Sequence, residues 1–181
     1  MATVKNLSGD NGLLHRDEKG DLRDNLSNRR VIIFSCSAYR SMCDALFEQF
    51  QSGATVILYR MGEGYGKRLV KGVSQLGQAQ EEKLDTFHKL AFLAGWGKIN
   101  IKVNKDYNGE VIVEESPFLL RRNDIGLTSC HFLSGVLAGA ASELFGQACK
   151  AVELRCASKS DSPICRFRIF TKTQEPIESS D

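Results

Sequence analysis

Three cysteines and one glutamate in the last third of the chain constrain how that part can fold. Cys130 precedes a run of small and apolar residues that is typical of a helix, and Glu153 and Cys156 lie on the run that follows it. Cys165 opens the next run, beyond a polar turn. Three thiols and one carboxylate provide four ligands, the number that a tetrahedral zinc site takes. A metal shared by these residues would tie the start of the helix to the final pair of strands.

The spacing of the cysteines leaves other interpretations open. Free cysteines are often buried as small apolar side chains, which we expect for Cys36, Cys43 and Cys149, and a disulfide is a further alternative. Glu153 and Cys156 are three residues apart, so a regular strand would point them to opposite faces. A shared metal therefore needs a bulge, or a strand that ends early. Cys149 lies on the same face as Glu153 and is a rival ligand.

The composition is that of a soluble globular protein. The 181 residues are 42% hydrophobic and 25% charged, which fits one domain with extensions and a sizeable core. The net charge of +2 favours neither an extended nucleic-acid surface nor a membrane surface. There is no signal peptide and no apolar run of membrane-spanning length, and the six cysteines then indicate a reducing compartment. We therefore expect a cytoplasmic protein.

The first half of the chain predicts mainly helices. Residues 1–29 are polar without a sustained period, which indicates a flexible extension, a loose lead-in strand or an arm around a partner subunit. Residues 31–34 have the composition of a short strand. Apolar spacing then predicts helices over 37–50, from about 54 to 73, and within 77–96. The glycines in GEGYGKR match neither a dinucleotide nor a P-loop fingerprint, and predict a loosened or kinked helix that a neighbour approaches closely.

The second half predicts two hairpins separated by a helix. KINIKVN and GEVIVEES alternate apolar and polar residues and are joined around Asn108-Gly109, a strong hairpin signal. KAVELRC and CRFRIF form the second pair. The helix between them, capped by Thr128 or Ser129, has a flat face of small residues that either packs closely on a neighbour or lines a ligand. Segregated helices and strands predict an α+β fold, with an antiparallel sheet from two hairpins packed against a helical layer.

These motifs together resemble the 4-vinyl reductase domain family, which also forms the sensory domain of bacterial activators of aromatic-compound catabolism. The resemblance covers roughly residues 30–171, leaving 1–29 as an extension and 172–181 as a polar, disordered tail. Its motif is a cysteine followed by an aromatic residue and a glycine, then Glu-x-x-Cys, then a cysteine with an aromatic residue two positions on: Cys130, Phe132, Gly135, Glu153, Cys156, Cys165 and Phe167.

The resemblance implies a structural zinc ion. In the sensor proteins of the family the matching residues form one Zn²⁺ site, which places the ligands here at Cys130, Glu153, Cys156 and Cys165. The loop before Cys165 is one residue longer than in those sensors and lacks their glycines, so the choice between Cys165 and Cys149 as the last ligand stays open. We expect basic residues nearby, Lys150, Arg155 or Arg166, to offset the negative charge of such a set.

The resemblance also implies the ligand-binding fold shared by nitric-oxide-sensing and Golgi-transport proteins, which usually form dimers. In that fold an apolar and aromatic cavity lies between the helices and the sheet. We therefore expect a zinc-containing sensor-type domain for a hydrophobic or aromatic small molecule, forming a homodimer and contacting neither nucleic acid nor membrane. Aromatic residues at suitable places are the candidate ligand contacts: Tyr59, Phe87, Phe92, Trp96, Tyr107, Phe118 and Phe132.

Other functions are compatible with the same resemblance. Ser134 stands where the phenol sensors have an aromatic residue, which makes phenol itself a less favoured ligand. One alternative is a tetrapyrrole-binding protein or reductase accessory of the 4-vinyl reductase type, but the chain has no flavin or nicotinamide fingerprint and no acid–base constellation. Another is an assembly subunit of the vesicle-tethering kind, in which the cavity holds an acyl chain and Cys43 could carry it.

Overall fold

The computed structural model describes residues 14–25, 28–74, 79–104, 108–120, 129–159 and 162–171. The chain divides into two compact units, Met1–Ser35 and Cys36–Asp181. Both the candidate ligand residue Tyr107 and the predicted tail at 172–181 lie outside the described residues. The domain boundaries expected at residues 30 and 171 stay a prediction.

The first unit is built on a small antiparallel hairpin, which composition alone did not predict. Strand β1 (Leu14–Arg16) pairs with β2 (Leu22–Asp24). The Asp17 carboxylate stabilises the connecting turn by accepting the backbone N–H groups of Lys19 and Asp21, at 3.0 and 2.9 Å. It also forms an ion pair with Arg23 at 2.7 Å.

The prediction of a strand at residues 31–34 is wrong. Arg30 forms one isolated bridge with Arg23, and the four residues that follow belong to no strand. Their β-branched and aromatic composition favours a strand, but a strand also needs a partner for its backbone N–H and C=O groups. The side chains of Ile32, Ile33 and Phe34 are 72%, 67% and 56% exposed.

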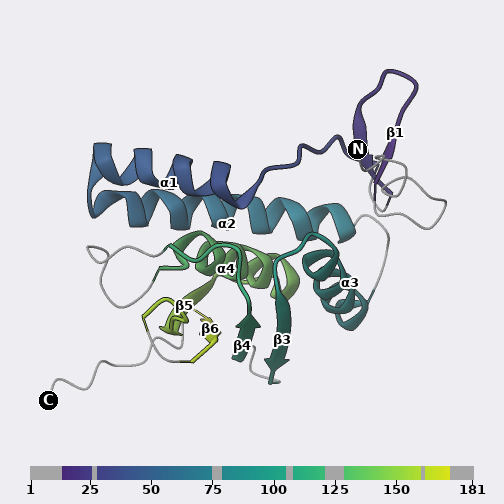
Figure 1. The fold of residues 1–181 in the computed structure, drawn as a ribbon. Coiled ribbons are helices and arrows are strands. Elements are labelled where there is room, and N and C mark those ends of the chain that lie inside the picture. Colours follow the sequence, from purple (N-terminus) through teal and green to yellow (C-terminus); the bar gives the residue numbers. More distant parts are fainter. Residues whose placement is uncertain are drawn as a thin grey trace, which may run out of the picture. The chain divides into compact units, whose positions relative to one another are not determined.

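The second unit is an α+β structure in which helices cover one face of a four-stranded sheet (Figure 1). The strands are all antiparallel and lie in the order β3-β4-β6-β5, so the second hairpin joins the first through the pairing of β4 with β6. Their bounds are β3 Lys98–Val103, β4 Gly109–Glu114, β5 Cys149–Arg155 and β6 Ile164–Thr171. The predicted fold class and both predicted hairpins are confirmed.

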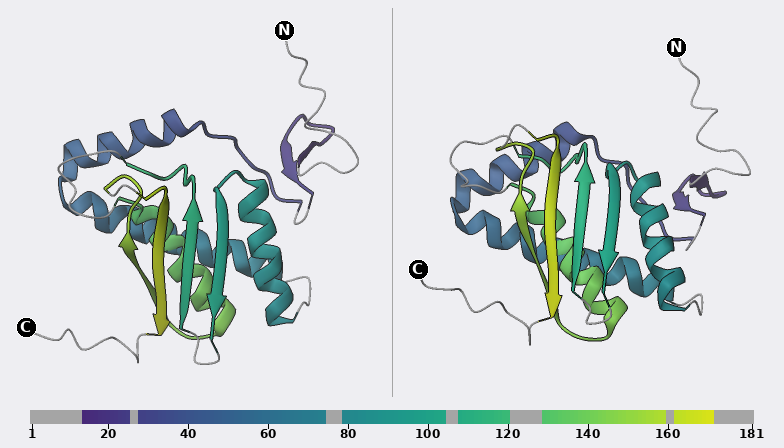
Figure 2. Two further views of the ribbon diagram at one scale, coloured as in Figure 1. Left: turned by 60° about the horizontal axis from the view of Figure 1, so that its bottom comes forward. Right: turned by 90° about the horizontal axis from the view of Figure 1, so that it is seen from below.

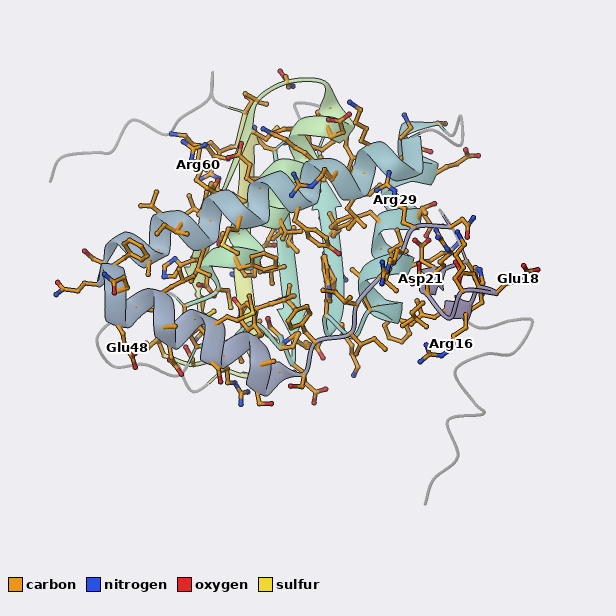
Figure 3. The ribbon with its side chains drawn as sticks, turned by 90° about the horizontal axis from the view of Figure 1, so that it is seen from above. Arg16, Glu18, Asp21, Arg29, Glu48 and Arg60 are labelled. Atoms are coloured by element: carbon orange, nitrogen blue, oxygen red, sulfur yellow. The ribbon has the colours of Figure 1, made fainter. Side chains whose placement is uncertain are left out.

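The helices of this unit are stacked on the sheet, with α4 between the sheet and α2 (Figures 1 and 2). Their bounds are α1 Cys36–Phe50, α2 Gly53–Ser74, α3 Gln80–Leu93 and α4 His131–Phe145. The main core forms around α4 and the inner face of the sheet, and a smaller cluster joins α1 to α2 through Cys43, Phe47 and Leu58. In Figure 3 the charged side chains Glu48 and Arg60 point away from α1 and α2.

Helices α2 and α4 pack with their backbones almost in contact. A Cβ atom on Gly62 would lie 2.0 Å from the carbonyl oxygen of Phe132, and one on Gly135 would lie 1.9 Å from that of Tyr59. Both distances are far too short for non-bonded atoms, so only glycine fits at these positions. The close approach expected at the α2 glycines is therefore confirmed, although α2 runs through them as one helix. The flat face of α4 meets α2.

Burial corrects one expectation about the cysteines. Cys43 and Cys149 are buried as expected, but Cys36 is exposed because it begins α1, most of whose residues are exposed. None of the helices that the structure describes is both long enough and apolar enough to cross a membrane.

Candidate metal centre

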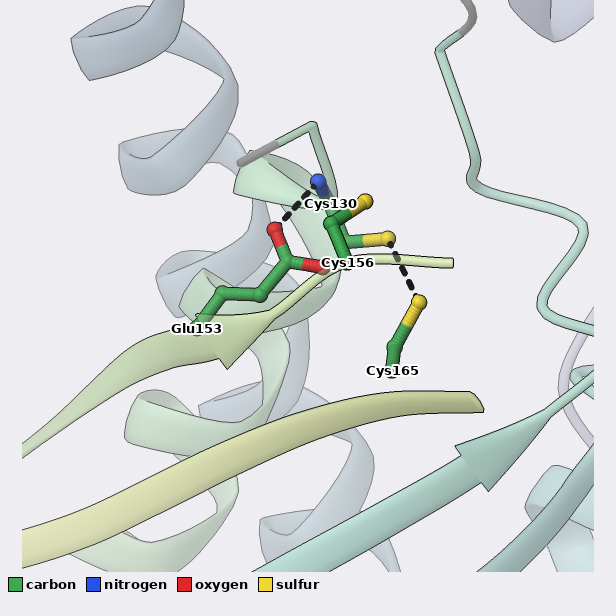
Figure 4. A group of neighbouring side chains, drawn as sticks. All are labelled: Cys130, Glu153, Cys156 and Cys165. Carbon is green, nitrogen blue, oxygen red and sulfur yellow. Dashed lines mark hydrogen bonds between the residues drawn. The ribbon is translucent and has the colours of Figure 1, made fainter. Parts of the chain in front are cut away.

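Cys130, Glu153, Cys156 and Cys165 lie together at one end of the sheet (Figure 4). The three sulfur atoms and one carboxylate oxygen all lie within 4.8 Å of one another, and all four residues are buried. We call this set the Cys3Glu cluster. Cys130 is the N-cap residue of α4, Glu153 lies on β5, Cys156 follows β5, and Cys165 is the second residue of β6. The cluster thus joins the start of α4 to the final hairpin.

An irregularity in β5 allows Glu153 and Cys156 to face the same point. Glu153 is opposite Phe167 in β6, but Arg155 is opposite Arg166, so the register shifts between them. Strand β5 then ends at Arg155. Both features expected for a shared metal are thus present, the bulge and the early end of the strand.

Cys149 lies outside the cluster. It begins β5, and its thiol donates a hydrogen bond to the carbonyl oxygen of Gln147 at 3.5 Å. The structure therefore places Cys165, and not Cys149, beside Cys130, Glu153 and Cys156.

The two oxygens of Glu153 have different surroundings. Oε2 accepts the backbone N–H groups of Ser129 and Cys130, each at 2.9 Å. Oε1 is buried and has no hydrogen-bond partner among the residues that the structure describes; Figure 4 shows it turned toward the cysteines. Burial raises the pKa of Glu153 to about 7, against the opposing effect of the hydrogen bond from Cys130 and with a contribution from the nearby Cys156 sulfur. A buried oxygen without a partner is the position that a bound cation would occupy.

The thiols of the cluster interact with one another. The sulfur atoms of Cys130 and Cys165 are 3.7 Å apart. Hydrogen bonds with Cys156 and Cys165, together with burial, raise the pKa of Cys130. The pKa of Cys165 is lowered by its contact with Cys130 but raised more by Cys156 and by burial, to about 12. Hydrogen bonds from Cys130 and Cys165 lower the pKa of Cys156, so the negative charge gathers on that sulfur.

The donor set fits a thiophilic metal ion. Zn²⁺ prefers sulfur and nitrogen ligands, accepts a carboxylate, and needs four ligands in a closed site. Among the basic residues expected to offset the charge, Arg166 instead pairs with Glu110 at 3.0 Å, and Arg155 is exposed. Hydroxyl and backbone N–H groups contact the cluster, and they reduce negative charge without cancelling it. The Cys3Glu cluster could therefore hold a metal cation.

Sequence reasoning missed two serines that contact the cluster. The hydroxyl oxygens of Ser129 and Ser158 lie 2.9 and 3.0 Å from the sulfur of Cys156, and 2.9 Å from each other. Ser129 was expected to cap α4, but the N-cap residue is Cys130, whose side chain forms no cap hydrogen bond. Their positions in the sequence could have indicated this contact, because each serine lies within two residues of a candidate ligand.

Four of the predicted ligand contacts belong to one aromatic group. Phe118 lies at its centre, with its ring centroid 5.3 Å from that of Phe132 and 5.5 Å from that of Trp96. Phe87 packs edge-on against Trp96, and Tyr39, which sequence reasoning did not select, lies 5.4 Å from Phe118. We call these five residues the aromatic group. Burial, followed by the nearby Cys43 thiol, raises the pKa of Tyr39.

The other candidates lie elsewhere. The Tyr59 hydroxyl accepts the backbone N–H of Ala151 at 3.4 Å and so connects α2 to β5. Phe92 is 62% exposed on α3. A surface hollow of about 420 Å³ opens beside the end of the β3–β4 hairpin, with Leu154 and Arg168 in its wall. Of the predicted contacts that lie in the described part of the chain, none lines it.

Comparison with known proteins agrees with this structure. Residues 110–171 match the family model of the V4R domain, which confirms the 4-vinyl reductase resemblance seen in the sequence. An uncharacterized protein of Methanocaldococcus jannaschii is 22% identical over 165 residues, covering 88% of this chain and 92% of that protein.

Two solved structures show the same fold. The phenol-responsive sensory domain of the transcription activator PoxR, solved with phenol, superposes with a TM-score of 0.72 at 22% identity, over 90% of this chain and 86% of that one. Subunit 3 of a trafficking protein particle complex from Naegleria fowleri, covalently bound to palmitic acid, gives 0.57 at 16% identity, over 76% and 92%. At these identities the likeness concerns the fold.

Proposed function

We propose that this chain, whose residues 110–171 form a V4R-type domain, is a zinc-containing small-molecule-binding domain of the sensor type. The observation that carries the zinc part is the Cys3Glu cluster, which presents three buried sulfurs and one buried carboxylate oxygen without a partner among the described residues. Four protein ligands leave no open coordination position, so the zinc would be structural. The ion would offset part of the negative charge of the thiolates and fix the start of α4 against β5 and β6.

The aromatic group supports a hydrophobic or aromatic ligand. Its rings come from α1, α3, α4 and the segments that follow α3 and β4, so they converge from several elements on one region. Tyr39 adds a buried hydroxyl beside these rings, which could orient a ligand with one polar group. The PoxR sensory domain, solved with phenol, has the same fold.

An acyl-carrying assembly subunit is less well supported. The trafficking subunit of similar fold is covalently bound to palmitic acid. In this chain Cys43 is 1% exposed, and burial raises the pKa of its thiol. Both features disfavour the thiolate that would attack an acyl donor.

The outer faces of α1 and α2 support the proposal of a homodimer. Met42, Phe50 and Val56 are 48%, 51% and 62% exposed there. Large apolar side chains grouped on adjoining helices are typical of an interaction surface. Because most soluble oligomers pair identical surfaces about a two-fold axis, a second copy of the chain is the proposed partner.

The proposed function is tested by native mass spectrometry of protein purified without added metal. We expect a mass that corresponds to one zinc ion per chain, and a retained organic molecule would identify the ligand class directly. Six thiols that react freely after mild denaturation, with no metal released, would contradict the zinc site. A palmitoyl adduct on Cys43 would favour the assembly subunit instead.

A further inference from the structure

We infer that Ser129 and Ser158 are positioning residues, whose hydroxyl groups donate hydrogen bonds to the Cys156 sulfur and hold it as a thiolate ligand of the metal. This inference rests on the proposed zinc site. It adds two residues that no motif of the sequence includes and assigns them a role in how tightly the metal is held.

The geometry around Cys156 is a closed triangle. Each serine oxygen is 2.9 or 3.0 Å from the sulfur, and the two oxygens are 2.9 Å apart. The serines reach the sulfur from different segments, since Ser129 directly precedes the N-cap residue of α4 and Ser158 lies in the turn after β5. That turn is held by the backbone hydrogen bond from Lys159 to the carbonyl oxygen of Cys156, at 3.1 Å.

The number of available protons limits what this triangle can do. Three contacts between two hydroxyls and a thiol can all be hydrogen bonds only if all three groups bring a proton. A metal-bound thiolate brings none, so two hydroxyl protons serve three contacts. Two arrangements are then possible. Either both hydroxyl groups donate to the sulfur, or one donates to the sulfur and accepts a hydrogen bond from the other. When the sulfur is a metal-bound thiolate, the two hydroxyl groups are therefore the hydrogen-bond donors in this triangle.

The hydroxyl groups of Ser129 and Ser158 would help to stabilise the excess negative charge of the metal site. Three thiolates and one carboxylate around Zn²⁺ leave two net negative charges in a buried place, which costs free energy unless hydrogen bonds stabilise them. Backbone N–H groups serve Glu153 Oε2, and the N–H of Ala157 serves Cys165 at 3.4 Å. Ser129 and Ser158 reach the Cys156 sulfur with their side chains, so these two hydrogen bonds can be removed by substitution without moving the backbone.

The experiment compares metal affinity in Ser129→Ala, Ser158→Ala and the double variant. Zinc affinity is measured by competition with a chromophoric chelator, and the cobalt-substituted proteins are compared by absorption spectroscopy. We expect the double variant to bind zinc about 10- to 100-fold more weakly, as is usual when partners of metal ligands are lost. The sulfur-to-cobalt charge-transfer band should move to lower energy, because an unsupported thiolate gives up its electrons more readily.

Two further variants separate positioning from general stability. Ser158 is half-buried, so Ser158→Thr can keep the hydroxyl and should retain the wild-type affinity and spectrum. Ser134→Ala removes a buried hydroxyl from α4 and should leave both unchanged. Ser129 is fully buried, so its variant could fold poorly. The comparison of Ser158→Ala with Ser158→Thr is therefore sufficient on its own to test the role of the hydroxyl group.

The outcomes distinguish this inference from the proposed function. Wild-type protein that binds neither zinc nor cobalt overturns the proposed metal site. Wild-type protein that binds metal, with alanine variants of unchanged affinity and spectrum, overturns the role of the serines alone. An equal loss of affinity in Ser134→Ala also overturns it, because that result reports general destabilisation.

Discussion

Oε2 of Glu153 accepts the backbone N–H of Cys130 at 2.9 Å, so the carboxylate that turns its other oxygen to the cysteines also holds the start of α4. One side chain thus connects β5 to the start of α4 and also belongs to the Cys3Glu cluster. The two tasks can be separated by substitution, because glutamine keeps an acceptor oxygen for the N–H groups but loses the negative charge of the ligand.

Glu153→Gln and Glu153→Ala should both weaken zinc binding, but they should differ in the absence of metal. Alanine leaves the buried N–H groups of Ser129 and Cys130 without an acceptor, which costs about 1–3 kcal/mol each. We therefore expect Glu153→Ala to unfold at lower urea concentration than Glu153→Gln in the presence of a chelator. Equal midpoints would show that the N–H contacts do not stabilise the metal-free protein.

Gly62→Ala should destabilise the protein by about 3 kcal/mol or more, because the added Cβ would overlap the Phe132 carbonyl and force α2 away from α4. Gly64→Ala on the same helix is the matched control. Its Cβ would meet only the Arg68 guanidinium, at 3.6 Å, so this change should be neutral or stabilise by up to about 1 kcal/mol. Thermal unfolding followed by circular dichroism measures both. Similar melting temperatures for the two variants would contradict the close packing.

Zinc affinity should fall steeply with decreasing pH. In the metal-free protein the pKa of Cys165 is raised to about 12 and that of Cys130 is also raised, so both thiols are protonated at neutral pH and lose their protons when metal binds. Below its pKa of about 7, Glu153 adds a third proton. The stability that the metal provides is thus present at neutral pH and lost on acidification. Competition titrations between about pH 8 and pH 6 should show more than a tenfold loss per unit; a constant affinity would contradict this.

Val56→Asp should convert the proposed dimer to a monomer, since it places a charge on an exposed apolar helix face. Val152→Asp is the control, because Val152 is similarly exposed, at 46%, but lies on β5. Light scattering after size-exclusion chromatography measures the mass. A wild-type monomer, or a dimer unaffected by Val56→Asp, would place the interface elsewhere or exclude it.

Ligand binding should change the fluorescence of Trp96, the single tryptophan of the chain and a member of the aromatic group. Titration with alkylphenols should give a saturable change in fluorescence, and Phe118→Ala should weaken binding by removing the ring at the centre of the group. Phe92→Ala, at an exposed position on α3, should leave the titration unchanged. Equal effects of Phe118→Ala and Phe92→Ala on the titration would show that the aromatic group is not the binding site.

Local patterns predicted most of the second unit. Alternating apolar residues identified the strands β3 to β6, and apolar residues at helical spacing identified the helices α1 to α4. Each element buries one face, so its apolar residues recur with the period of a strand or of a helix. The prediction of a strand at residues 31–34 was wrong, because a strand also needs a pairing partner, which composition does not specify. The glycines of α2 predicted a close neighbour, and the structure identifies that neighbour as α4.

The site was predictable only where its residues carry distinctive chemistry. Cysteines and a glutamate can be selected from sequence, and the bulge after Glu153 follows from the need to bring Cys156 to the same face. Ser129 and Ser158 carry no such signal, since serine is common in turns and at helix starts. Tyr39 was not among the predicted ligand contacts, because its approach to Phe118 depends on the path of the segment after β4, which local sequence patterns do not specify.

The most direct test of the central claim is the zinc content of the wild type, Cys156→Ser and Cys36→Ser, measured by elemental analysis on protein purified without added metal. Cys36→Ser removes an exposed cysteine outside the cluster and controls for non-specific thiol binding. The account predicts one zinc ion per chain in the wild type and in Cys36→Ser, and little or none in Cys156→Ser together with a lower melting temperature. Zinc that persists in Cys156→Ser, or a wild type without zinc, would contradict it.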